Sequence, residues 1–90
     1  MKIPFMKAQG AGNDFIIVDK NVDFIRKSKK VIKRLCDRRF GVGCDQLILI
    51  KKISSYYQVT FYNSDGSLGK NCGNGLRCAY KFLVEIKKVK

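Results

Sequence analysis

The distribution of apolar and polar positions along the chain predicts four β-strands. The segments are short and rich in β-branched and aromatic residues: IPFMKAQ (residues 3–9), FIIVDK (15–20), QLILIKK (46–52) and YYQVTFYN (56–63). The third segment is almost continuously apolar, which is typical of a strand buried on both faces. The turn-rich sequence GAGND separates the first two strands, and NSDGS follows the fourth.

Two further segments have the apolar spacing of helices. From Ser28, the sequence SKKVIKRLCDRR has apolar residues at 31, 32, 35 and 36, so we expect a helix that Ser28 caps and that ends near Phe40. From about Gly75, LRCAYKFLVEI predicts a second helix, with an apolar face made of Leu76, Ala79, Leu83 and Ile86. The resulting order, ββαββα, indicates an α/β domain with mixed strands.

Length and composition suit a single small domain. The chain has 90 residues, of which 46% are hydrophobic, so residues 1–90 can form one domain or a part of a larger one. No apolar run approaches the ~20 residues that span a bilayer, and the N-terminal segment lacks the features of a signal peptide. We therefore expect a cytoplasmic protein that does not contact a membrane.

The chain contains four cysteines, namely Cys36, Cys44, Cys72 and Cys78. An even number would permit two disulfides, but the secretory context that favours them is missing. The spacings do not form the tight pairs of a structural zinc site, and the chain has no histidine to complete one. We expect reduced thiols and no metal.

The net charge of +12 raises the question of a nucleic-acid partner. Lysines are scattered along the chain, and the one internal cluster, RKSKKVIKR (26–34), is interrupted by apolar residues at helical spacing. This is the pattern of a solvated helix face. No RNA-recognition signature, zinc finger or helix-turn-helix pattern accompanies the charge, so nucleic acid is not the expected partner.

The sequence KNCGNGLRC (70–78) places a cysteine between glycines and asparagines just before the second predicted helix. Cys72 could pack, bind a metal, form half a disulfide, or act as a nucleophile or base. A helix N-terminus attracts anions and stabilises a thiolate, and Gly73 and Gly75 let a ligand approach the backbone. We therefore expect Cys72 to be the most acidic and most readily alkylated thiol. Cys44, which also follows a glycine turn, is its nearest competitor.

Cys36 lies on the apolar stripe of the first predicted helix, and Cys78 lies within the second. We expect both to pack in the core.

The other glycine-containing loops carry amide and carboxylate side chains at strand ends. GAGNDF provides Asn13 and Asp14, GVGCDQ provides Asp45 and Gln46, and YNSDG provides Asn63 and Asp65. Turn formation explains the three aspartates at least as well as ligand binding does. Amides at the ends of three different loops would suit a ligand with amino and carboxylate groups at both ends.

Four motifs, GAGNDF, DRRFGVGCDQ, YNSDG and NCGNGLRC, occur in this order from about Lys7 to Phe82. In sequence and spacing they resemble the N-terminal half of the diaminopimelate epimerase family. The resemblance implies cofactor-independent interconversion of LL- and meso-diaminopimelate, in lysine and peptidoglycan-precursor synthesis. It also implies a fold of two similar α/β domains, each with strands around a central helix and with the site in the cleft between them.

The same resemblance implies roles for particular residues. Cys72 would be one of two catalytic cysteines, and Gly73 and Asn74 would bind the reacting carboxylate. The distal end of the substrate would be held by Asn13, Gln46 and Asn63.

Family members continue into a second domain that supplies the other cysteine. The chain would then be a fragment or gene remnant, one subunit of a split enzyme, or a half-site that assembles with another copy. We expect little epimerisation by the chain alone. The alternative is a basic binding domain, derived from an epimerase, that has no catalytic activity.

Overall fold

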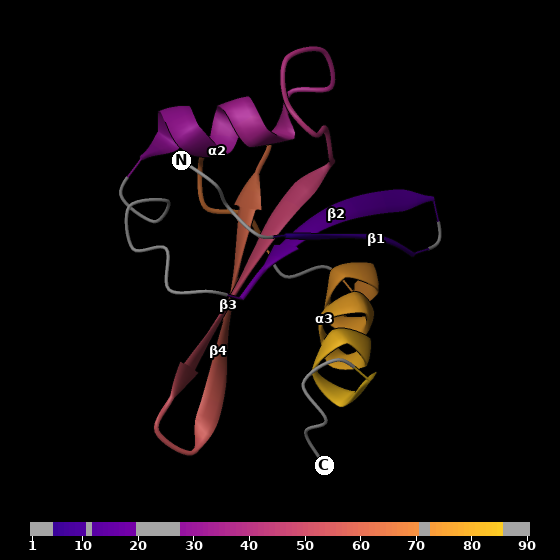
Figure 1. Cartoon of the computed structure of the whole chain (residues 1–90), viewed down its shortest axis with the longest axis vertical. Helices are drawn as coiled ribbons and strands as arrows, with labels where there is room; N and C mark the ends of the chain where they lie inside the picture. The colour runs from indigo at the N-terminus through magenta and orange to yellow at the C-terminus, as the bar shows by residue number, and fades with distance from the viewer. Residues whose placement is uncertain (1–4, 11, 20–27, 71–72, 86–90) are drawn as a thin grey trace.

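The computed structural model of the chain describes residues 5–10, 12–19, 28–70 and 73–85 (Figure 1). The elements follow the predicted order ββαββα: β1 (Met6–Gly10), β2 (Asn13–Val18), α2 (Lys29–Cys36), β3 (Gln46–Ile53), β4 (Tyr56–Asn63) and α3 (Gly73–Glu85). Neither helix of these residues is long and apolar enough to cross a membrane.

The strands form one mixed sheet in the order β1-β2-β3-β4. The pairs β1–β2 and β3–β4 are antiparallel, whereas β2 and β3 are parallel. Parallel neighbours need a crossover, and α2 lies in the connection between them. The far end of the β3–β4 hairpin extends away from α2 (Figure 1). The predicted α/β class with mixed strands is therefore confirmed.

Each helix covers one face of the sheet, because successive residues of a strand point to opposite faces. On the face that α2 covers, the core consists of Ile16, Val18, Leu47, Leu49 and Tyr62 with Ile32, Cys36 and Cys44. On the face that α3 covers, it consists of Phe15, Ile17, Ile48, Ile50 and Phe61 with Ala79 and Phe82. We call these the α2 face and the α3 face. The consecutive residues 47–50 of β3 are all buried, which confirms the prediction of a strand covered on both sides.

Helix α2 begins as predicted and ends earlier than predicted. The Ser28 hydroxyl accepts a hydrogen bond from the Val31 N–H, which is an N-cap. The helix ends at Cys36 instead of near Phe40 because the Asp37 carboxylate accepts hydrogen bonds from the Arg39 and Phe40 N–H groups. This side chain offers the backbone a turn in place of another helical turn.

Helix α3 begins at Gly73, two residues before the predicted start, and packs through a different face. Its buried residues are Gly75, Ala79 and Phe82. Leu76 is 46% exposed, so its predicted place on the apolar face with Ala79 was wrong. Gly75 has no side chain, and it therefore lets the first turn approach the sheet more closely than Leu76 would. Leu83 packs partly buried against the core, and Ile86 lies outside the described residues.

Candidate functional site

Three of the predicted site residues lie at one edge of the sheet. Asn13 begins β2, Gln46 begins β3 and Asn63 ends β4. Because β2 and β3 are parallel and β4 is antiparallel to β3, these three ends meet at the same edge. Alternation along the strands places all three side chains on the α3 face, in line with Phe15, Ile48 and Phe61. We call this group the amide edge.

Gln46 and Asn63 are direct neighbours across two strands and are half-buried. The Gln46 Nε2 donates to Asn63 Oδ1 at 3.4 Å, and Asn63 Nδ2 donates to Ser67 Oγ at 3.0 Å and to the Leu68 carbonyl at 3.4 Å. A Cβ atom at Gly69 would lie 2.8 Å from both Asn63 Oδ1 and Gln46 Nε2. The segment after β4 therefore lies against this amide pair, whereas Asn13 is exposed.

The first turn of α3 lies beside the same edge. Gly10 pairs with Asn13, and a Cβ atom at Gly10 would lie 3.5 Å from the Asn74 carbonyl oxygen. The first N–H groups of a helix have no partner within it, and together with the helix dipole they favour an anion. Gly73 is exposed, and a Cβ atom there would meet nothing within 4 Å, so the space beside it is open. Cys72 lies outside the described residues, and its predicted role stays a prediction.

On the α2 face of the same edge, four charged residues bind one another; we call Lys7, Asp14, Arg38 and Asp45 the charged clamp. The Arg38 guanidinium donates to both oxygens of Asp14, at 2.9 and 2.8 Å, and to Asp45 Oδ1 at 3.0 Å. The two aspartates also accept from each other's backbone N–H groups, at 3.0 and 2.9 Å. The Lys7 ammonium lies 3.2 Å from Asp14 and donates to the Gly43 carbonyl.

The clamp shifts the pKa values of Asp14 and Arg38. The Arg38 guanidinium holds the pKa of Asp14 well below its usual range, and Asp14 in turn raises the pKa of Arg38. With their oxygens bound to Arg38 and to backbone N–H groups, Asp14 and Asp45 hold the GAGND and GVGCDQ loops together. This agrees with a structural interpretation of both aspartates. The sequence analysis missed Arg38 and Lys7. The only signal in the sequence was that each of these cations lies close to a loop that carries a carboxylate.

Asp65 serves the turn after β4. Its carboxylate accepts from the Ser67 N–H at 2.9 Å and from the Ser67 hydroxyl at 2.6 Å. These hydrogen bonds lower the pKa of Asp65.

The three cysteines that the structure describes have free thiols, and all pack against the core. Cys36 and Cys44 are each 3% exposed on the α2 face, while Cys78 is half-buried on the α3 face. The setting of Cys44 disfavours its thiolate, while the predicted order of acidity between Cys44 and Cys72 stays a prediction because Cys72 lies outside the described residues. A hydrogen bond to the Cys36 sulfur, together with burial, raises the pKa of the Cys44 thiol. Among the described residues, no three potential metal-binding side chains come together.

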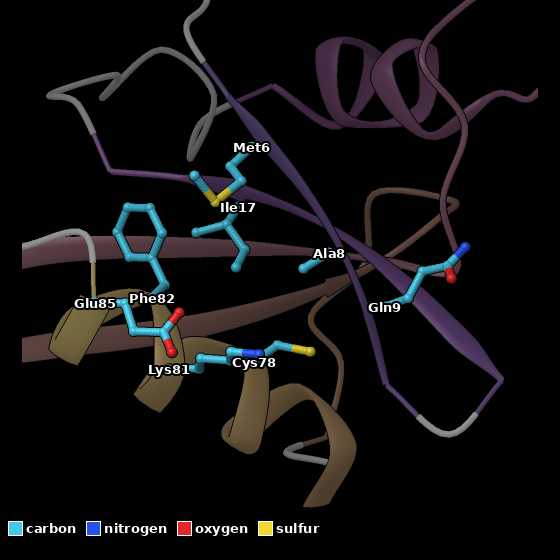
Figure 2. A pocket seen from close by; sticks show the side chains of 8 residues that line it. All are labelled: Met6, Ala8, Gln9, Ile17, Cys78, Lys81, Phe82 and Glu85. Atoms are coloured by element: carbon cyan, nitrogen blue, oxygen red, sulfur yellow. The ribbon is translucent and has the colours of Figure 1, made fainter.

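A cavity of about 230 Å³ lies between β1 and α3 (Figure 2). Its lining includes the apolar side chains of Met6, Ile17 and Phe82, with Lys81 and Glu85 on α3. Of the predicted site residues that the structure describes, none lines this cavity. It is thus separate from the amide edge, and no convergent set of amides surrounds it.

Comparison with known proteins identifies the family. The family model of diaminopimelate epimerase matches residues 5–90. The diaminopimelate epimerase of Leptospira biflexa is 45% identical over 86 residues, which are 94% of this chain and 31% of that protein. Those of Pelagibacter ubique and Prochlorococcus marinus are 48% and 46% identical, over 92% and 99% of this chain and 30% and 34% of their own lengths. The chain spans about a third of the length of these curated relatives. It belongs to the diaminopimelate epimerase family.

Proposed function

We propose that this chain provides one half of the active site of a diaminopimelate epimerase, which interconverts LL- and meso-2,6-diaminopimelate in lysine biosynthesis in the cytoplasm. The observation that carries the proposal is the convergence, on one face and one edge of the sheet, of three amides and a helix N-terminus. An amino acid with charged groups at both ends needs both kinds of partner. The reaction would need no cofactor.

The α3 N-terminus and the amide edge would bind opposite ends of the substrate. The backbone N–H groups of Gly73 and Asn74 would bind the reacting carboxylate and stabilise the charge that develops on it when the α-proton leaves. Asn13, Gln46 and Asn63 would hold the distal amino and carboxylate groups. A substrate group at Asn63 would compete with its present hydrogen bonds to Ser67 and Leu68, of which the second is long.

Cys72 would remove or deliver the α-proton on one face of the substrate. It directly precedes α3 in sequence, and a helix N-terminus lowers the pKa of a thiol. Inversion also needs an acid or base on the other face, since return of the proton to the same face only restores the starting isomer. Cys36 and Cys44 are buried on the opposite face of the sheet. The second thiol would therefore come from a complementary second-domain polypeptide or from another copy of the chain.

The test is incubation of LL-diaminopimelate in D₂O, with deuterium uptake and the meso isomer measured separately. We expect the 90-residue chain alone to form almost no meso isomer, because losing one positioned acid or base typically costs about 10²–10⁴-fold in rate. Addition of a second-domain polypeptide from a relative should restore meso formation. The restored activity should be lost in Cys72→Ala and kept in the matched variant Cys78→Ala, which removes a thiol within α3 instead.

Of three other outcomes, the first and the last would contradict the proposal, and the second would decide where the second thiol comes from. Fast meso formation by the chain alone, independent of its concentration, would refute the need for a second thiol. Meso formation that rises with the square of chain concentration would assign the second half-site to another copy. If the folded chain neither exchanges the α-proton nor gains activity from any second-domain polypeptide, the catalytically inactive binding domain is the correct alternative.

The role of Cys72 can also be tested without turnover. Trypsin releases each cysteine in a separate peptide: LCDR (35–38), FGVGCDQLILIK (40–51), NCGNGLR (71–77) and CAYK (78–81). Brief iodoacetamide labelling of the folded chain should modify the Cys72 peptide first, and at a lower pH than the others. Labelling of the Cys44 or Cys78 peptide ahead of it would refute the assignment.

A further inference from the structure

Two buried thiols that the proposed reaction does not use are in direct contact on the α2 face. The Cys44 thiol donates a hydrogen bond to the Cys36 sulfur, with 3.3 Å between the two sulfur atoms. The backbones that carry them are joined as well, because the Cys44 N–H donates to the Cys36 carbonyl at 3.2 Å. The Val42 and Gly43 N–H groups also donate to the Leu35 carbonyl. The two residues are therefore held side by side by the fold and not merely by their closeness in sequence.

The short distance between the sulfur atoms favours a disulfide. A disulfide forms only where two cysteine backbones are close, and its sulfur atoms lie about 2 Å apart. The two sulfur atoms would need to approach by little more than about 1 Å, which a change in side-chain torsion can supply. The backbone hydrogen bonds between the two segments could stay in place.

Cys36 is 3% exposed, and it lies at the wall of an open cleft. An open cleft of about 410 Å³ lies beside the end of α2 and the turn after β4, and Cys36 is among the residues that line it. The other charged lining residues are Lys33, Arg38 and Arg39 together with Asp37 and Asp65, so positive charges outnumber negative ones beside Cys36. An excess of positive charge favours an anionic sulfur and an anionic leaving group. The hydrogen bond from Cys44 lowers the pKa of the Cys36 thiol, which makes Cys36 the sulfur that attacks.

We propose that Cys36 and Cys44 form a redox-active dithiol that hydrogen peroxide converts to a reversible disulfide. In the first step the Cys36 thiol loses its proton, the thiolate attacks one peroxide oxygen, the O–O bond breaks, and the hydroxide that leaves takes up this proton to become water. This gives Cys36 sulfenic acid. In the second step the Cys44 sulfur attacks the Cys36 sulfur, the S–O bond breaks, the S–S bond forms, and water leaves. Two thiols lose two electrons in total, and the peroxide is reduced to two molecules of water.

The disulfide would tie the end of α2 to the residue that precedes Asp45. Both cysteines lie next to members of the charged clamp, since Arg38 follows Cys36 by two residues and Asp45 follows Cys44 directly. Oxidation would thus stabilise the packing of the α2 face at this edge of the sheet. The amides lie at the same edge, on the opposite face. In a reducing compartment such a pair is reduced at rest and serves as a transient redox site. The inference does not depend on epimerase activity.

The test is titration of the folded 90-residue chain with hydrogen peroxide, followed by blocking of free thiols, trypsin digestion and mass spectrometry. We expect the chain to lose about 2 Da, two of its four thiols to become unreactive, and the peptides LCDR and FGVGCDQLILIK to be recovered as one linked species. Dithiothreitol should restore both thiols. The urea midpoint of the oxidised chain should lie above that of the reduced chain, and the difference should vanish on reduction.

Controls separate a folded redox site from chance pairing. The same oxidation in urea should give a mixture of pairings, because four cysteines allow three connectivities. The Cys78→Ser variant should form the linked species as fast as the original chain. In Cys44→Ser, Cys36 should accumulate as sulfenic acid that dimedone labels. The proposal is overturned if the native chain links Cys72 to Cys78 instead, or if it oxidises Cys36 only irreversibly. It is equally overturned if both buried thiols stay reduced at peroxide concentrations that oxidise Cys72.

Discussion

Asn13 and Asp14 are consecutive residues at the start of β2, yet their side chains belong to opposite faces of the sheet. Asp14 lies on the α2 face, where both its oxygens bind Arg38 and one lies near Lys7. Asn13 lies on the α3 face and is exposed at the edge beside the first turn of α3. The charged clamp and the amide edge thus occupy the same end of the same strands. The charges of the clamp are paired with one another, whereas the amide edge carries neutral side chains, of which Asn13 is exposed and Gln46 and Asn63 are half-buried.

The difference shows how one sheet edge can be both rigid and available for binding. A carboxylate that is paired and accepts several hydrogen bonds is hard to displace, because any replacement must compensate for its lost partners. In the clamp these partners join the loops before β2 and β3, and this fixes the spacing of Asn13 and Gln46 on the other face. Neutral amides can exchange hydrogen-bond partners with a ligand at a smaller cost. We infer that the clamp positions the amide edge.

The largest expected difference is between substitutions at these two neighbours. Asp14→Asn removes the charge that Arg38 and Lys7 bind. We expect the free energy of unfolding to fall by about 1–2 kcal/mol. The expected loss is no larger because Arg38 is exposed and solvent screens its interaction with Asp14. Asn13→Asp makes the reverse exchange on the α3 face and should change stability by less than about 0.5 kcal/mol. Urea unfolding of both variants measures the comparison. Equal losses of unfolding free energy in the two variants would show that the clamp stabilises the fold no more than the amide edge does.

The pH dependence of stability should isolate the same carboxylate. Because Arg38 lowers the pKa of Asp14 in the folded chain, Asp14 contributes stability above the unfolded-state pKa of about 3.9. This contribution is lost as the pH falls through the lower folded-state pKa. The pKa values of Asp37 and Asp65 are also lowered, by backbone N–H groups and by Ser67. As the pH is lowered from 7 to 2, the urea midpoint should therefore fall in both the original chain and the Asp14→Asn variant. The fall should be less steep in the variant. Parallel curves would contradict the pairing.

Most of this organisation follows from the sequence. The four strands were predicted from β-branched and aromatic runs, and the bounds of β4, Tyr56–Asn63, match the predicted segment. Once a strand begins at Asn13, alternation alone puts Asn13 with Phe15 on one face and Asp14 with Ile16 on the other. The same counting places Gln46 and Asn63 on the same face as Asn13. The convergence of the amides was therefore accessible from periodicity and strand order.

The remaining features depend on contacts between distant segments, which no local pattern encodes. Arg38 reaches Asp14 across 24 positions, and neither residue's neighbours indicate the other. The end of α2 depended on whether Asp37 would cap the helix or continue it, and side-chain hydrogen bonding decided it. Leu76 was assigned to the apolar face of α3 because it is apolar, but close packing of Gly75 against the sheet turned it outward. The contact between Cys36 and Cys44 required the fold.

A smaller effect is expected at the half-buried amide pair. Gln46→Glu replaces a donor to Asn63 with a carboxylate, so that Asn63 must either lose this bond or turn its amide away from Ser67 and Leu68. We expect a loss of about 1 kcal/mol in the free energy of unfolding and weaker binding of diaminopimelate. The matched control is Gln58→Glu, an exposed position on the same strand as Asn63, which should have almost no effect. Weaker binding in both variants would indicate general charge repulsion and not a role for Gln46.

The smallest effect, and the only gain in stability, is expected at the opposite end of β3 and β4, away from both halves of the edge. Ser54 in the two-residue turn between these strands has φ = 54°, a conformation that costs a residue with a side chain about 1 kcal/mol. Glycine adopts it freely, but it also gains freedom in the unfolded chain, so we expect Ser54→Gly to stabilise by only about 0.5 kcal/mol. Ser55 does not share this conformation, and Ser55→Gly should therefore destabilise slightly. Urea unfolding measures both variants, and binding of diaminopimelate should be unchanged in each. If Ser54→Gly raised the urea midpoint and also weakened binding, the hairpin turn and the distant amide edge would be coupled. The expectation that this turn is independent of ligand binding would then be wrong.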